Sequence, residues 1–261
     1  MTTEHGYPEQ PAATPPQSAS RPRRRRWWIA LGVAVVVMCG CCSFGDRLAA
    51  NIAEDQLVPV VEDAAAEHEL EASETHVELK GFPFLTQVAQ REFDGADIKM
   101  KNATLQQVPL ENVNITLSGV TVPSDLLTGA DPHDVTVERV DGVVRIDPKV
   151  LAARLPVPDL ELRTTNGKLF AQARLEIRGF TGVVEGEVSL RVDNEMIVPN
   201  VSQLTSQGGP APEVATEYIN TELERGYALP ELPFGLSLTE VAIRGDLIEI
   251  RGEGGDTTLA N

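Results

Sequence analysis

Apolar and polar residues alternate along many short segments between residues 77 and 250. In one of them, Val113, Ile115 and Leu117 are separated by Asn114 and Thr116. Successive side chains of a β-strand point to opposite faces of the sheet, so this period of two predicts strands with one apolar and one polar face. About nine such strands with few helices between them predict an α+β domain built on an antiparallel sheet.

Turn signals and helical segments complete this outline. Three dipeptides between alternating segments predict hairpins: Asp141-Gly142, Asn166-Gly167 and Gly245-Asp246. Three segments have helical patterns instead: 44–70, 148–155 and 212–227. Pro59 is expected to kink or restart the first of them. Four apolar residues share one face of the last: Val214, Tyr218, Ile219 and Leu223. Helices that cover the apolar sheet face incompletely would leave a groove for an apolar ligand.

An uncharged run of 19 residues, Trp27–Gly45, follows the cluster Arg21 and Arg23–Arg26. As a helix this run would be about 28 Å long, close to the thickness of a bilayer's hydrocarbon core. Arginines before the run keep that side cytoplasmic, so the remainder is expected outside a cell membrane crossed once. The predicted parts are a disordered basic cytoplasmic tail at 1–26, a transmembrane signal-anchor at 27–45, an exported domain at 46–252 and a flexible tail at 253–261.

Two other fates of this N-terminal segment stay open. Met38-Cys39-Gly40-Cys41 is a weak match to a bacterial lipobox, so lipidation at Cys41 is one alternative. Cleavage as a signal peptide is the other, although Leu48-Ala49-Ala50 is a poor match to a cleavage site.

The charge balance excludes one broad class of function. The chain carries 39 acidic and 22 basic residues, a net charge of −17. So acidic a surface repels phosphate backbones, which excludes nucleic-acid binding.

A search for catalytic chemistry finds no candidate. The chain has no nucleophile elbow, P-loop, zinc-protease helix or dinucleotide-binding glycine motif. All three cysteines lie between Cys39 and Cys42, and the four histidines have no metal-ligand spacing. The sequence therefore predicts no enzyme, no cofactor and no metal site.

One motif places bulky apolar residues around a proline at a predicted strand end. It reads Gly81-Phe82-Pro83-Phe84-Leu85-Thr86-Gln87-Val88, and a related element, Leu232-Pro233-Phe234-Gly235-Leu236, follows the last predicted helix. Both elements are either corners of a filled core or walls of a hydrophobic groove. In the second interpretation the lipid-binding residues are Phe82, Phe84, Leu85, Val88, Leu232, Phe234 and Leu236.

These two elements, with the N-terminal export helix and the closing hairpin, resemble the LmeA-like phospholipid-binding family of actinobacterial cell-envelope proteins. The similarity covers about residues 46–252. The resemblance implies a fold similar to tubular lipid-binding domains, in which a strongly curved sheet packs around one or two long helices. It also implies a phospholipid or another acyl-chain ligand, and no catalytic residue. The mycobacterial namesake is associated with lipomannan elongation, which leaves a role in lipoglycan maintenance open.

The sequence thus predicts a membrane-anchored, exported phospholipid-binding protein of the bacterial cell envelope. The alternative is a non-catalytic structural or regulatory interaction module of the envelope with a filled core. An enzyme would need a clustered acid or nucleophile, which the sequence does not show.

Overall fold

A computed structural model describes residues 23–122, 135–155, 157–224, 227–228 and 235–258. The chain divides into two compact units, Met1–Gly45 and Asp46–Asn261. Every strand of the described residues belongs to the second unit.

The first helix, α1 (Arg23–Glu67), continues through Pro59. The sequence-based expectation that Pro59 restarts the helix is therefore wrong. Proline cannot donate to the carbonyl of Asp55, but both residues are exposed, so water can satisfy that carbonyl. Over the described residues, no helix is both long and apolar enough to cross a membrane. The structure does not describe the side chains of residues 23–39, so the membrane segment 27–45 stays a prediction.

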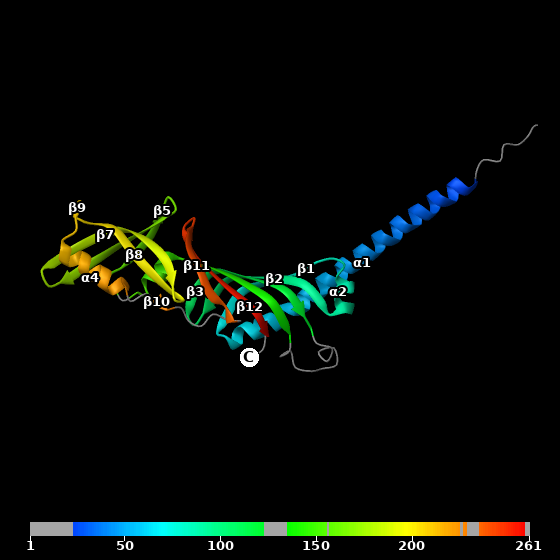
Figure 1. The fold of residues 1–261 in the computed structure, drawn as a ribbon, viewed down its shortest axis with the longest axis horizontal. Helices are drawn as coiled ribbons and strands as arrows, with labels where there is room; N and C mark the ends of the chain where they lie inside the picture. Colours follow the sequence, from blue (N-terminus) through cyan, green and yellow to red (C-terminus); the bar gives the residue numbers. More distant parts are fainter. Residues whose placement is uncertain (1–22, 123–134, 156, 225–226, 229–234, 259–261) are drawn as a thin grey trace, which may run out of the picture. The chain divides into compact units, whose positions relative to one another are not determined.

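Two open sheets, antiparallel throughout, make up the second unit (Figure 1). The first sheet has the order β1-β2-β3-β4-β12-β11. Its strands are β1 (Leu70–Lys80), β2 (Glu92–Leu105), β3 (Val108–Thr121), β4 (Thr136–Ile146), β11 (Ser237–Arg244) and β12 (Leu247–Thr258). A short helix, α2 (Phe84–Gln90), lies between β1 and β2.

The second sheet has the order β10-β8-β7-β6-β5, with β9 paired to β8. Its strands are β5 (Glu161–Thr165), β6 (Lys168–Ile177), β7 (Phe180–Asp193), β8 (Met196–Ser206), β9 (Gly209–Pro210) and β10 (Tyr227–Ala228). Helix α3 (Pro148–Ala152) leads into this sheet, and α4 (Glu213–Glu224) follows it and contacts β8 and β7.

The predicted α+β class with antiparallel pairing is confirmed, and the strand pattern explains why. On β3, Val113, Ile115 and Leu117 are buried, and the residues between them lie at the polar face. The strands are more numerous than expected and form two sheets rather than one. Strands that share an apolar face do not reveal which sheet they join, since the pattern specifies the face but not the partner.

Two of the three predicted hairpin turns are confirmed. Asn166-Gly167 joins β5 to β6, and Gly245-Asp246 joins β11 to β12. The third prediction, at Asp141-Gly142, is wrong, because both residues lie within β4 and pair with β12. A Cβ atom at Gly142 would come within 2.7 Å of Leu236 Cδ1, so this glycine serves close packing rather than a turn.

The main core lies between the first sheet and the C-terminal part of α1. Leu57, Val58 and Val61 of α1 pack on it, and Ala65 is buried within it. The same cluster extends to the second sheet, for example to Leu169 on β6. A second cluster, which includes Ala173 on β6 and Ile219 on α4, borders a cavity.

Candidate functional site

An apolar cavity lies on one face of the second sheet. Residues two apart on each strand share that face, and they line the cavity from four neighbouring strands. The lining comprises Leu151, Leu155, Val157, Leu160, Leu162, Leu169, Ala171, Ala173, Val184, Val188, Leu190, Ile197, Pro199, Val201, Leu204, Ile219 and Leu223. The cavity volume is about 40 Å³, smaller than the roughly 300–1,000 Å³ of common ligand sites, so a bound chain would have to push the lining residues apart.

Two alanines on β6 leave part of this space unfilled. Ala171 pairs with Gly186 of β7, and Ala173 pairs with Val184. A Cβ atom at Gly186 would come within 2.5 Å of Val201 Cγ1, so β8 already occupies the position above this glycine. Protein interiors are normally close-packed, and a hollow lined by small residues marks a place where packing is left incomplete.

Helix α4 and the segment after α3 cover the hollow. Ala215 and Ile219 are the buried residues of α4, and Ile219 and Leu223 face the cavity. Val214, which was predicted to share the apolar face of this helix, is 38 % exposed. Leu151 and Leu155 line the cavity from the other helical segment.

The lining determines what this cavity can bind. Every described residue that forms it has an apolar side chain. A polar group placed there would lose its hydrogen bonds to water without replacement, at a cost of about 2–7 kcal/mol, whereas a hydrocarbon chain would gain from burial. The lining therefore favours an acyl chain over a polar group, and the headgroup of a lipid would have to stay at the mouth.

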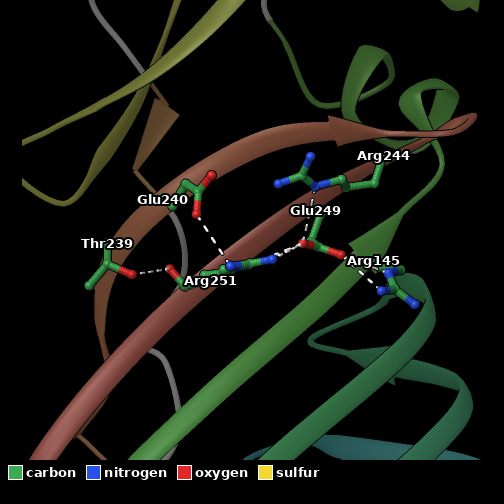
Figure 2. Close-up of polar contacts among 6 residues, drawn as sticks. All are labelled: Arg145, Thr239, Glu240, Arg244, Glu249 and Arg251. Atoms are coloured by element: carbon green, nitrogen blue, oxygen red, sulfur yellow. Dashed lines mark hydrogen bonds and ion pairs between the residues drawn. The ribbon is translucent and has the colours of Figure 1, made fainter. Parts of the chain in front are cut away.

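The most concentrated group of charges lies on β4, β11 and β12 and is structural (Figure 2). The carboxylate of Glu249 is 3 % exposed and accepts hydrogen bonds from Arg145 Nε at 2.9 Å and from Arg251 Nη2 at 2.8 Å. Burial raises the pKa of Glu249, but the hydrogen bonds from Arg251 and Arg145 outweigh it and hold the pKa below its ordinary value. A carboxylate held in its charged form is a poor general acid at neutral pH.

The described side chains also do not form a candidate metal site. Among them, no three His, Cys, Asp or Glu residues lie together as metal ligands would.

Comparison with protein families decides what kind of chain this is. The family model described as LmeA-like phospholipid-binding matches residues 44–253, which is most of the sequence. The chain belongs to the LmeA-like phospholipid-binding family. Membership indicates a lipid ligand and confirms the resemblance seen in the sequence. No curated protein and no solved structure matches the chain.

In this LmeA-like chain four of the residues predicted to bind lipid lie at or in α2 and differ in their exposure. Phe82, Leu85 and Val88 are 58, 54 and 36 % exposed around α2, whereas Phe84 is buried, with its ring centroid 6.2 Å from that of Phe93. Those four residues do not line the cavity.

The second predicted element is only partly described. Leu236 is half-buried, packs on the main core and is not among the cavity residues. Leu232 and Phe234 lie outside the described residues. Contact between lipid and any of these predicted residues stays a prediction.

The cavity of this LmeA-like chain was not found from its sequence, although a signal exists. The inward positions of β6 are Leu169, Ala171, Ala173 and Leu175, so two small residues stand between two large ones. Alanines at successive inward positions predict that the core is incompletely filled there. Locating a cavity also requires the identity of the covering helix, which the strand pattern does not contain.

Proposed function

We propose that this protein binds a phospholipid by placing an acyl chain in the cavity between the second sheet and α4. The observation that carries the proposal is the lining of this cavity, in which every described side chain is apolar. The family match independently favours a lipid. No polar residue faces the acyl chain, so the headgroup would lie at the mouth and contribute less to recognition than the chain does.

Native mass spectrometry of the full chain tests this proposal. The protein is released from detergent under activation that removes detergent adducts. We expect one phospholipid mass to remain bound at a discrete stoichiometry. A chain released with no lipid, from membranes rich in phospholipid, would instead favour the interaction module with a filled core.

We further propose that the chain is anchored in the cell membrane by residues 27–45, with its second unit exported. The arginine cluster before an uncharged run of this length supports that orientation. A reporter active only in the cytoplasm should be active at the N-terminus and silent at the C-terminus. Activity at both ends would contradict export, and silence at both would contradict the orientation.

A role in envelope lipid or lipoglycan maintenance is the biological setting we propose for such a protein. An anchored domain with an acyl-chain site could hold or present a lipid at the outer surface of the membrane. Deletion of the gene should change the lipid or lipoglycan profile of the envelope, and complementation with a cavity-filled variant should fail to restore it. Unchanged profiles on deletion would argue against this setting.

A further inference from the structure

Helix α2 buries Phe84 and the polar Gln87 and exposes two other apolar residues. Leu85 and Val88, three residues apart on one face, are 54 and 36 % exposed, and Phe82 just before the helix is 58 % exposed. On the opposite face, Gln87 is only 7 % exposed. A surface helix normally packs its apolar stripe on the core and presents polar residues to water. Apolar residues exposed together, beside a buried polar residue, are typical of a surface that meets an apolar partner.

Several hydrogen bonds fix this orientation. The Asp46 carboxylate, which is itself buried, accepts from the backbone N–H groups of Phe84 and Leu85, both at 2.8 Å. Gln87 Nε2 donates to the Lys80 carbonyl at 3.2 Å. Gln87 Oε1 accepts from the backbone N–H of Asp94 at 2.7 Å. The helix cannot roll its apolar face inward without breaking these bonds, so the exposure is built into the fold.

The position of Asp46 in the chain indicates what meets this surface. Asp46 directly follows the uncharged run Trp27–Gly45, and consecutive Cα atoms are about 3.8 Å apart. If that run crosses the membrane, Asp46 lies at the surface of the bilayer. The start of α2, whose backbone N–H groups donate to the Asp46 carboxylate, would then lie close to the same surface. Three side chains around one seven-residue helix are too few for a stable protein interface, which needs about 800 Å² on each partner. Inserting a few apolar side chains is enough for a lipid surface.

We propose that Phe82, Leu85 and Val88 insert into the surface of the bilayer beside the anchor. This inference rests on the proposed membrane anchoring and is separate from the acyl-chain cavity. The docked α2 would fix how the second unit stands on the membrane.

Depth-dependent fluorescence quenching in vesicles tests the proposal. The full chain with Trp27→Phe and Trp28→Phe, which has no other tryptophan, receives Phe82→Trp as its only reporter. It is reconstituted into phosphatidylcholine and phosphatidylglycerol vesicles with or without bromines on the acyl chains. We expect brominated lipid to lower the fluorescence of the Phe82→Trp reporter at least twofold. The matched control is Val214→Trp in the same background, because Val214 is also exposed and lies on α4; it should lose less than a tenth.

The outcomes separate the two proposals. Co-flotation with vesicles after carbonate washing reports the anchor alone. A chain that does not co-float overturns the anchor and the docking together, whereas a chain that co-floats but shows equal quenching at both reporters overturns only the docking. Loss of quenching on adding Leu85→Asp, with an unchanged circular dichroism spectrum and unchanged co-flotation, would support insertion. Absence of quenching together with dimers that Leu85→Asp dissociates would show that the surface pairs with a second copy instead.

Discussion

Ala173 on β6 lies directly opposite Val184 on β7, and both residues line the apolar cavity. They are 4 and 2 % exposed, respectively, although the space above them is not filled. The side chain of Ala173 is a single methyl group. A larger apolar side chain at this position would therefore fill part of the cavity without changing the polarity of the site.

Filling the cavity at Ala173 should remove the bound lipid. Ala173→Leu adds three carbon atoms to the cavity, and we expect it to lower the phospholipid retained per chain at least tenfold. Overpacking costs about 1–3 kcal/mol, which is less than the typical stability of a folded domain, so the fold should persist. Lipid extraction and mass spectrometry on detergent-purified full chains measure the effect.

Ala66→Leu is the control for this experiment, because it makes the same chemical change at an exposed position near the end of α1. Lipid that is carried along in the detergent micelle should be the same for both variants, so it does not affect the difference in retained phospholipid between them. Equal retention by Ala173→Leu and the wild type would place the acyl chain outside this cavity.

The strands could be predicted from the sequence because their signal is local. Alternation identifies an apolar face, and the Asn166-Gly167 turn depends only on the conformations that its own two residues favour. Asp141-Gly142 carries the same local signal, yet it lies within β4, where Leu236 packs against Gly142 from a distant part of the chain. A short-range pattern cannot distinguish a glycine needed for a turn from one needed for close packing.

The candidate site was less predictable, since a cavity is defined by the volume that distant segments fail to fill. Ala171 and Gly186 meet only because β6 pairs with β7, and Ile219 covers them from α4. Large apolar residues such as Phe82 and Leu85 suggest a binding wall because they are costly to expose. In the structure they are exposed, because the hydrogen bonds of Asp46 and Gln87 fix α2 with these two side chains toward solvent.

Two neighbouring residues of α2 should respond very differently to truncation. Phe84→Ala removes a ring that is 9 % exposed and lies tilted against the ring of Phe93, and we expect it to lower the free energy of unfolding by about 3–5 kcal/mol. Leu85→Ala removes a side chain that is 54 % exposed and should cost less than about 1 kcal/mol. Thermal melts followed by circular dichroism compare the two, because the second unit has no tryptophan. Similar losses for both variants would contradict an orientation of α2 that buries Phe84 and exposes Leu85.

The Asp46 carboxylate should stabilise the start of α2. Asp46→Asn keeps the size of the side chain but places an amide NH₂ against one of two backbone donors. Hydrogen bonds to a charged acceptor contribute about 1.5–3 kcal/mol, so we expect a loss in that range. Hydrogen exchange should also quicken at the amides of Phe84 and Leu85. Asp55→Asn, at an exposed position of the same helix, should change neither quantity.

Stability should fall in acid because two carboxylates have lowered pKa values in the folded chain. For Asp97, burial alone would raise the pKa, but hydrogen bonds from Lys80 and Thr116 hold it below its ordinary value; Glu249 behaves in the same way. Their unfolded pKa values are near 3.8 and 4.5. As the pH falls below about 4.5, the unfolded chain binds protons before the folded chain does. The stabilisation is therefore present above that pH and is lost as the pH falls through the lower, folded values.

Glu249→Gln isolates one of these groups. At neutral pH it should lower the free energy of unfolding by about 1–2 kcal/mol, since the arginines that lose their partner are 40–57 % exposed on their side chains and stay solvated. The difference from the wild type should shrink below about pH 4.5 and vanish once Glu249 is protonated in the folded chain. Glu240→Gln is the matched control, because its carboxylate is 48 % exposed and lies 3.5 Å from Arg251, so its removal should cost less than about 0.5 kcal/mol. Denaturant melts at a series of pH values measure both variants, and a Glu249→Gln difference that stayed constant down to pH 3 would show that the charge of Glu249 does not stabilise the fold.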